Sequence, residues 1–190
     1  MMPAIPELQT ERLLLRPFQA TDAPAVQTLA SAAEVAATTL VPHPYPEGAA
    51  AAWIASHAEA AARGERFEWA IERRADRALL GVIGLGLETA HRRGAVGSWL
   101  GVPFWNQGYA TEAARRVVAF GFAELDLHRI EGPFFPRNAA SARVLEKVGM
   151  RYEGTLRGHV LRGDAFEDVA MYAMLRGEWD DGGDPALPRR

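Results

Sequence analysis

The chain has 190 residues, which suits one domain with short extensions. Hydrophobic residues make up 48% and charged residues 24%, and the formal net charge of -3 argues against the broad basic surface that nucleic acid requires. No cysteine is present, so disulfides, thiolate nucleophiles and cysteine metal sites are excluded.

Signals of membrane insertion, secretion and metal binding are missing from the sequence. No apolar run approaches the roughly 20 residues that a membrane-spanning helix needs, and the first residues lack the basic and apolar segments of a secretory signal. The five histidines show no short metal-ligand spacing. We therefore expect a cytoplasmic protein that uses no metal and binds neither membrane nor nucleic acid.

The first half of the chain predicts one strand, two helices and three further strands. Residues 12–18 predict a strand, and Thr21 or Asp22 can cap the helix that follows. Residues 47–63 are rich in alanine and predict a second helix, which ends at Gly64. Further strands are expected at residues 67–72, 79–87 and 95–102, the first two forming a hairpin.

The second half predicts a β-α-β crossover and a final pair of strands. Residues 110–125 have apolar positions at helical spacing, and small residues such as Gly121 would let this helix lie close to a sheet. Further elements are expected at residues 129–135 (strand), 138–148 (helix), 150–157 and 166–175 (strands). The order predicts an α/β (α+β) domain over residues 10–179, with flexible ends at residues 1–9 and 180–190.

The stretch WNQGYATEAARR, at residues 105–116, has the features of an anion site. The first turn of a helix has backbone N–H groups without intrahelical partners, and the helix dipole adds positive charge there. Gly108 and Ala110 leave the approach open, and side-chain donors are added by Asn106, Gln107 and Thr111. The pattern matches neither a P-loop nor a dinucleotide G-x-G-x-x-G. A glycine turn before an ordinary core helix is the alternative.

Four stretches appear in a characteristic order: TERLLLRPF at residues 10–18, AVGSWLGVPFWNQGYATEA at residues 95–113, LHRIE at residues 127–131 and PRNAASARVLEKVGM at residues 136–150. In this order they resemble the GNAT superfamily of N-acetyltransferases. More narrowly, they resemble the RimJ/RimL-type branch, which acetylates N-terminal amines of ribosomal proteins, and its small-molecule relatives.

The resemblance implies the GNAT fold and acetyl-CoA (coenzyme A) as co-substrate. The fold would be a mixed, mostly antiparallel seven-stranded sheet with a central pair of splayed parallel strands and about four helices. The pantetheine arm would lie between the splayed strands and contact Leu100, Val102 and Asn138. The pyrophosphate would bind the backbone of Gln107, Gly108, Tyr109, Ala110 and Thr111.

Acetyl transfer to an amine requires a neutral amine, a donor to the thioester oxygen and a proton donor to the departing thiolate. The resemblance places the Ser141 hydroxyl near the sulfur, although Ser141 also fits an ordinary first-turn helix residue. Asn138 can cap the same helix through its carbonyl and donate through its amide. The oxygen donor is expected to be a backbone N–H near Leu100 or Gly101.

The sequence leaves the general base open. The positions where relatives carry a glutamate correspond here to Ala95 and Pro133. Glu88 and His91 lie near the end of a predicted strand and could act through water, but both also fit solvated loop residues. An α-amine needs little help near neutral pH, so a dedicated base could be absent.

These features predict transfer of an acetyl group from acetyl-CoA to a primary amine, by direct attack in a ternary complex. The acceptor would be a protein N-terminal α-amine or a small-molecule amine. Its groove would be bordered by the two early helices, the loop at residues 41–46 and the final hairpin at residues 162–164. The alternative is a non-catalytic acyl-CoA-binding or regulatory module of the same fold. A homodimer is compatible with the resemblance, because dimers are common in the family.

Overall fold

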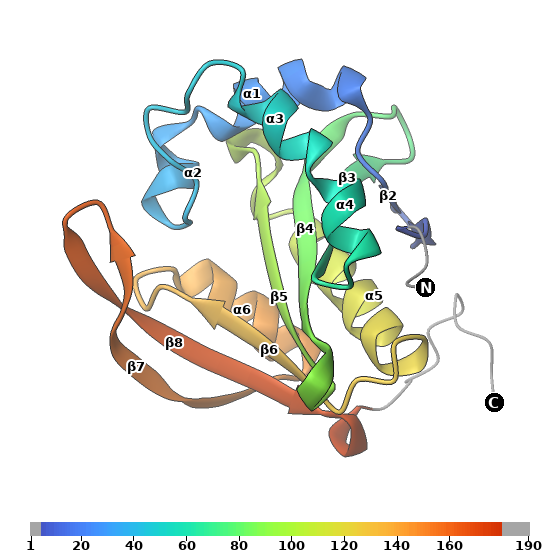
Figure 1. The fold of residues 1–190 in the computed structure, drawn as a ribbon, viewed down its shortest axis with the longest axis vertical. Helices are drawn as coiled ribbons and strands as arrows, with labels where there is room; N and C mark the ends of the chain where they lie inside the picture. Colours follow the sequence, from blue (N-terminus) through green and yellow to red (C-terminus); the bar gives the residue numbers. More distant parts are fainter. Residues whose placement is uncertain (1–4, 180–190) are drawn as a thin grey trace.

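An eight-stranded sheet forms the centre of the chain, which the computed structural model describes over residues 5–179 (Figure 1). The strands follow the order β1-β2-β3-β4-β5-β6-β8-β7, and β5 and β6 are parallel to each other. The strands are β1 (Leu8–Gln9), β2 (Leu13–Arg16), β3 (Arg66–Arg73), β4 (Leu79–Glu88), β5 (Arg93–Leu100), β6 (Arg129–Phe134), β7 (Arg151–Arg162) and β8 (Ala165–Leu175). The helices are α1 (Ala23–Ala30), α2 (Ala33–Ala37), α3 (Ala49–Ala55), α4 (His57–Ala62), α5 (Tyr109–Ala123) and α6 (Ala139–Val148).

The predicted α/β class and the mixed, mostly antiparallel sheet are confirmed, but the sheet has eight strands rather than seven. The additional strand is β1, which pairs with β2 at the edge of the sheet. It forms because Leu8 is fully buried and because the Trp69 indole N–H donates to the Pro6 carbonyl at 2.7 Å. The ordered part therefore begins before residue 10. Of the ends predicted to be flexible, residues 1–9 and 180–190, residues 1–4 and 180–190 lie outside the described residues.

Two helices differ from the sequence prediction. The single helix expected over residues 47–63 is divided at Ser56 into α3 and α4. The N–H and the hydroxyl of Ser56 both donate to the Trp53 carbonyl, at 3.1 and 2.7 Å, and this tightened turn ends α3. The helix α2 was not expected, because its five residues are too few to show an apolar repeat.

The central parallel strands separate after a short paired segment. β5 and β6 pair at three consecutive positions, of which the last places Ala95 opposite Glu131. Beyond this point β5 remains paired with β4 up to Leu100, and β6 remains paired with β8 up to Phe134. Figure 1 shows the two strands diverging, with β5 following β4 and β6 following β8. The predicted splayed pair is therefore present.

Small residues let α5 lie close to one face of the sheet. A Cβ atom at Gly121 would lie 2.7 Å from Cδ1 of Ile130 on β6, so only glycine fits at this distance. The Phe120 ring packs edge-to-face against Phe67 and Trp69 of β3, with centroids 5.8 and 5.7 Å away. These contacts fix α5, and with it the position of its first turn.

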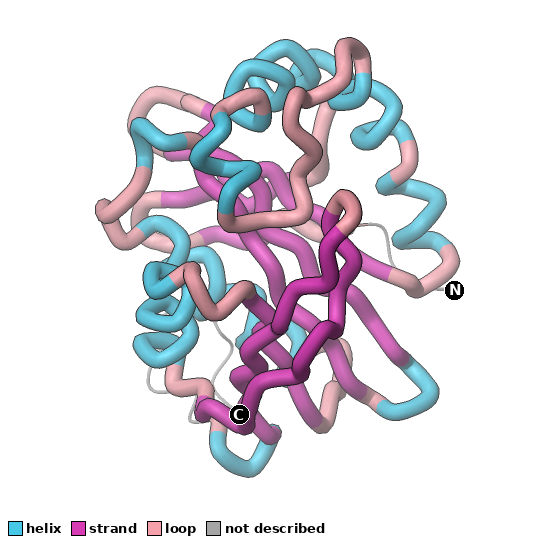
Figure 2. The backbone as a smooth tube through the Cα atoms, turned by 90° about the vertical axis from the view of Figure 1, so that its left-hand side faces the viewer, coloured by secondary structure: helices cyan, strands magenta, loops and turns pink. Residues whose placement is uncertain are grey.

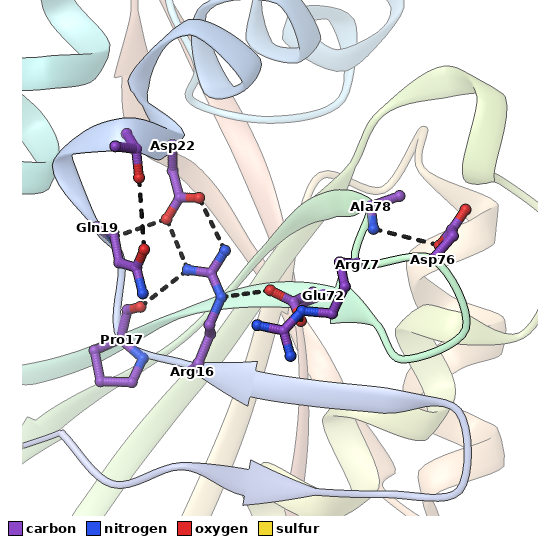
Figure 3. Close-up of polar contacts among 9 residues, drawn as sticks. Arg16, Pro17, Gln19, Asp22, Glu72, Asp76, Arg77 and Ala78 are labelled. Atoms are coloured by element: carbon purple, nitrogen blue, oxygen red, sulfur yellow. Dashed lines mark hydrogen bonds and ion pairs between the residues drawn. The ribbon is translucent and has the colours of Figure 1, made fainter.

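A buried ion network anchors the helices on the opposite face (Figure 3). Arg16 of β2 donates to both Asp22 oxygens, at 2.7 and 2.9 Å, and to Glu72 of β3 at 2.6 Å. Burial opposes ionisation of Asp22, but the hydrogen bonds from Arg16 and from the Gln19 N–H outweigh it and lower the pKa of this carboxyl. Because Asp22 immediately precedes α1, the network joins α1 to the sheet.

We expect Gly121→Val to lower the free energy of unfolding by about 1–3 kcal/mol, because the added carbons would overlap Ile130 and Leu127. The midpoint of urea denaturation measures this change. Gly177→Ala is the control, since a Cβ there meets nothing within 4 Å. Equal midpoints for Gly121→Val and wild type would contradict the close packing of α5.

Candidate active site

The predicted site residues meet at one edge of the sheet. Because β5 and β6 are parallel, their carboxyl ends lie at the same edge, where α5 and α6 begin. Arg115 of α5 donates to the Lys147 carbonyl of α6 at 2.6 Å, which holds the two helices together. Leu100 ends β5, and the predicted site residues that follow β5 or β6 at this edge are Val102, Gln107, Gly108, Tyr109, Ala110, Thr111, Asn138 and Ser141.

Backbone groups at the end of β5 face the gap that β6 leaves. The Gly101 N–H donates to the Leu80 carbonyl at 2.9 Å, so Leu100 and its opposite residue Gly81 are a pair without mutual hydrogen bonds. Leu100 therefore points its N–H and C=O away from β4. The alternation of antiparallel pairs gives Ser98 the same orientation. Since β6 has separated here, these groups can pair with an extended ligand as a strand would.

The strand ends earlier than predicted, which changes the role available to Val102. Val102 lies in a 3₁₀ turn, Val102–Phe104, and its carbonyl accepts the Trp105 N–H at 3.2 Å. The Leu100 carbonyl accepts the Trp105 indole N–H at 2.7 Å. The proline at 103 lacks the N–H that a strand ladder needs, which explains the early end. The groups directed at the gap are thus those of Ser98 and the N–H of Leu100.

The start of α5 has the geometry of an anion site. Gly108 adopts the left-handed conformation, φ 81°, and no side chain caps the helix. The first helical hydrogen bond runs from the Glu112 N–H to the Gly108 carbonyl, so the N–H groups of Tyr109, Ala110 and Thr111 precede the ladder. The Gln107 amide, which we expected to be a free donor, donates to the Pro103 carbonyl at 2.9 Å. The site therefore depends on backbone N–H groups and the helix dipole.

Arg12, which the sequence did not single out, fixes the turn before α5. Its Nη1 donates to the Gln107 carbonyl at 3.0 Å, its Nε donates to Glu112 at 2.6 Å, and its guanidinium lies 4.6 Å from the Tyr109 ring centroid. Thr10 also donates to Glu112, at 2.6 Å. Arg12 and Thr10 lie in the stretch TERLLLRPF, which predicted only a strand, and their contact with α5 arises from tertiary folding.

A cavity of about 470 Å³ lies beside this turn, and three of the residues around it are arginines. Arg12 and Arg73 are paired with Glu112 and Asp76, whereas the Arg74 Nη1 donates to the Thr10 and Glu11 carbonyls. The cavity is lined by Glu11, Arg12, Arg73, Arg74, Ala75 and Tyr109. Among the residues described, no carboxylate forms an ion pair with Arg74, so Arg74 adds positive charge next to the N-terminus of α5, which favours anion binding there.

Asn138 and Ser141 form the first turn of α6. The Asn138 side-chain oxygen accepts the Ser141 N–H at 3.1 Å, which is the predicted capping bond. The Asn138 amide donates to the Thr38 carbonyl at 3.4 Å. Ser141 is partly exposed, and its hydroxyl has no hydrogen-bond partner among residues 5–179. That hydroxyl is therefore available as a donor at the edge where β5 and β6 have separated.

The C-terminal end of α2 lies beside this edge and is held there by hydrogen bonds. Three side chains donate to carbonyls at its C-terminal end: Arg162 to Ala36 at 2.7 Å, Arg137 to Ala37 at 2.9 Å and Asn138 to Thr38 at 3.4 Å. The donors come from the β7–β8 hairpin and from the segment before α6. Figure 2 shows this hairpin rising toward the helical segments above it. The final hairpin and the early helix α2 therefore meet beside this edge.

Glu88 and His91 lie far from the carboxyl ends of the central strands. Glu88 is opposite Arg93 and binds its Nε at 2.6 Å, at the end where β5 and β6 are paired. At ~3.4 Å per residue, the length of β5 separates this end from Leu100 by roughly 24 Å. His91 is 3.5 Å from Glu88 and occupies the same end. Neither residue can serve as a base at the gap.

We expect Asn138→Ala to lower the free energy of unfolding by about 1 kcal/mol, because α6 would lose its cap. Asn138→Ser is the matched control, since serine also accepts a capping hydrogen bond. Urea denaturation compares the two variants. The capping role would be refuted if alanine and serine gave the same midpoint as asparagine.

Comparison with known proteins agrees with this geometry. A family model described as an acetyltransferase (GNAT) domain matches residues 12–151. The chain is 33% identical over 172 residues to an uncharacterized N-acetyltransferase of Bacillus subtilis (strain 168), YoaA, covering 90% of this chain and 97% of that protein. Among the helices described over residues 5–179, none is both long and apolar enough to cross a membrane.

Solved structures show the same fold. A GNAT-family acetyltransferase from Bacillus anthracis has 28% identity and a TM-score of 0.82, with coverage of 90% of this chain and 99% of that one. RimL, a ribosomal L7/L12 α-N-protein acetyltransferase in complex with coenzyme A, has 20% identity and a TM-score of 0.81, with coverage of 91% and 98%. The chain therefore belongs to the GNAT family and is an acetyl-CoA-dependent N-acetyltransferase.

Proposed function

We propose that this protein transfers the acetyl group of acetyl-CoA to a primary amine, either the N-terminal α-amine of a protein or a small-molecule amine. The proposal rests on one observation: the unpaired backbone at the end of β5 adjoins the uncapped first turn of α5. The unpaired backbone of β5 at Ser98 and Leu100 leads through one short loop to the uncapped start of α5. Acetyl-CoA combines an extended arm that carries amides with a diphosphate, so both parts of this surface fit the same molecule.

The residues proposed to hold acetyl-CoA follow from this fit. The backbone from Gln107 to Thr111 would bind the diphosphate, with Arg12 holding the turn in place. The backbone of Ser98 would pair with an amide of the arm, and the Leu100 N–H would bind the thioester oxygen at the end of the arm. Ser98 replaces Val102, whose carbonyl is already engaged in the 3₁₀ turn. When bound, acetyl-CoA supplies an acetyl group activated as a thioester.

The chain's own residues supply positioning, charge stabilisation and a proton. The Leu100 N–H is directed at the gap and is placed to stabilise negative charge on the thioester oxygen. Asn138 holds the first turn of α6, and the Ser141 hydroxyl there is placed to protonate the departing sulfur. The chain has no cysteine to carry the acetyl group on a thiol, so direct attack with both substrates bound is the simplest route.

Two acceptor classes are proposed for the region next to α2. RimL, which shares the fold, is named as an acetyltransferase of the α-amine of ribosomal protein L7/L12, and this supports a protein N-terminus. A free α-amine has a pKa of roughly 7.7–8.0, against about 10.4 for lysine, so an α-amine loses its proton more readily near neutral pH. Thiol release from acetyl-CoA, measured with peptides of different first residues, polyamines and amino acids, identifies the acceptor. Acetyl-CoA binding without thiol release for any amine would favour the non-catalytic module.

We expect Gly108→Glu to abolish coenzyme A binding in calorimetry, because it puts bulk and negative charge where the diphosphate would lie. Gly48→Glu is a matched control. Gly48 is the N-cap of α3 with φ 75°, so both variants place a glutamate in the same strained conformation before a helix. Unchanged affinity in Gly108→Glu, or equal loss in both variants, would contradict the assignment.

We expect Ser141→Ala to lower kcat at least about tenfold while acetyl-CoA affinity changes little, because only proton donation to the sulfur is lost. Steady-state kinetics with an acceptor from the panel measure kcat, and calorimetry measures affinity. Ser56→Ala controls for loss of an exposed hydroxyl on another helix end. Wild-type turnover in Ser141→Ala would remove this residue from the mechanism.

A further inference from the structure

One carboxylate on the sheet lies in an unusual row of residues. Glu68 of β3 is directly opposite Gly84 of β4, and Gly84 is directly opposite Gly97 of β5. Residues opposite one another in a sheet point to the same face. Glu68 is therefore the single side chain that extends beyond the backbone in this three-strand row, and the two glycines leave the space beside it free.

The Glu68 carboxylate points along this row toward β5. A Cβ atom at Gly84 would lie 2.4 Å from Oε2 and 2.9 Å from Oε1 of Glu68, so the carboxylate occupies the space above the glycine. A Cβ at Gly97 would meet nothing within 4 Å, and Gly97 is exposed. At a strand spacing of ~4.8 Å, the open position over Gly97 is about one strand away from the carboxylate.

The open position adjoins the proposed site of acetyl-CoA. Gly97 immediately precedes Ser98, whose backbone faces the gap between β5 and β6. It also lies beyond Ala95, the last residue at which these strands are paired. An amine above Gly97 would thus be next to the place where the strands part, with Glu68 within reach through one bridging water.

Glu68 lacks the pairing that stabilises other buried carboxylates. Its nearest cation is the Nε of Arg66, at 3.9 Å, and no hydrogen bond to this carboxylate is found within residues 5–179. Its side chain is 16% exposed. Burial raises the pKa of Glu68 to about 7, and Arg66 opposes this shift. On the same strand and face, Glu72 is instead held by Arg16.

Other charged groups near this row do not replace Arg66 as a partner. His57 of α4, which packs on β3, is buried against Phe18 and Trp53. Burial lowers the pKa of His57 to about 4, so its ring is neutral near pH 7. Glu59 of α4 is exposed and pairs with Arg63. Protonation of Glu68 near neutral pH therefore affects only the 3.9 Å contact with Arg66.

We propose that the Glu68 carboxylate is the general base that accepts the proton which the acceptor ammonium group must lose. The inference rests on the proposed acetyl transfer and adds a catalytic residue to it. The usual positions of such a base correspond to Ala95 and Pro133, which carry no acid. Glu68 lies on a different strand and reaches the same region across two glycines.

The proton and electron balance of the step is complete. The ammonium nitrogen gives one proton to Glu68, and its lone pair forms the C–N bond to the thioester carbon. The C–S bond breaks with its electron pair on sulfur, which receives a second nitrogen proton through the Ser141 hydroxyl. Glu68 then releases its proton to water. An ammonium and a thioester thus yield an amide, a thiol and one proton.

The test compares Glu68→Gln with wild type, using the amine that the acceptor panel identifies. We expect kcat/KM of wild type to rise with pH through about 7, because only the deprotonated carboxylate accepts a proton. Glu68→Gln should lose about 100-fold or more at pH 7.5 and should lack this inflection. With hydroxylamine, which is largely unprotonated at neutral pH, the loss should be much smaller. Glu65→Gln, an exposed glutamate before the same strand, is the control and should match wild type.

Gly84→Ala tests the geometry without removing the carboxylate. The added methyl would displace the flexible end of Glu68, so we expect a loss of at least about tenfold in kcat with unchanged coenzyme A affinity.

The stability of Glu68→Gln provides a second measurement. This variant should unfold at the same or a higher denaturant midpoint at pH 8.5. The raised pKa makes the charged form of Glu68 destabilising as pH rises through about 7, and glutamine carries no charge.

The possible outcomes separate this inference from the proposed function. A wild-type pH profile and rate in Glu68→Gln, or a loss accompanied by lower stability or lower coenzyme A affinity, would overturn the role of Glu68 alone. Wild-type protein that binds acetyl-CoA but releases no thiol above the enzyme-free rate with any amine, hydroxylamine included, would overturn acetyl transfer and the role of Glu68 together.

Discussion

The constraint on which this structure depends is that β5 and β6 are each paired along their length with a different neighbour. β4 holds β5 and β8 holds β6, so the two halves of the sheet share three paired positions and then separate. The separation leaves backbone hydrogen-bonding groups at Ser98 and Leu100 without a strand partner. Such groups are costly to leave unsatisfied away from water, and this cost favours a ligand that can pair with them.

Hydrogen bonds from side chains fix the backbone that follows β5. The Trp105 indole N–H donates to the Leu100 carbonyl, and the Arg12 guanidinium donates to the Gln107 carbonyl. These bonds satisfy acceptors in the turn, while the N–H groups at the start of α5 remain directed outward. An anion needs donors rather than acceptors, so this arrangement suits the proposed binding of a diphosphate.

Two glutamates on β3 have different neighbours, and we propose that they therefore have different roles, Glu72 in the fold and Glu68 in catalysis. Glu72 and Glu68 lie on one face of one strand, but Arg16 pairs with Glu72, and Glu68 has glycines beside it. A carboxylate that is hydrogen-bonded to a cation keeps its charge and stabilises the fold, whereas a largely buried carboxylate whose nearest cation is 3.9 Å away titrates near neutral pH. Glycine has a low strand propensity, so Gly84 and Gly97 weaken their strands. In the proposed mechanism, they leave room for the acceptor amine.

The sequence alone determined the family, most of the elements and the capping role of Asn138, and it predicted the anion site at Gly108, because these features are local patterns of a few residues. The tertiary structure decided that Val102 leaves the strand, that Glu88 is at the wrong end of it, and that Glu68, Gly84 and Gly97 form one row. Strand register and side-chain direction depend on pairing between segments far apart in the chain, and no local pattern specifies such pairing.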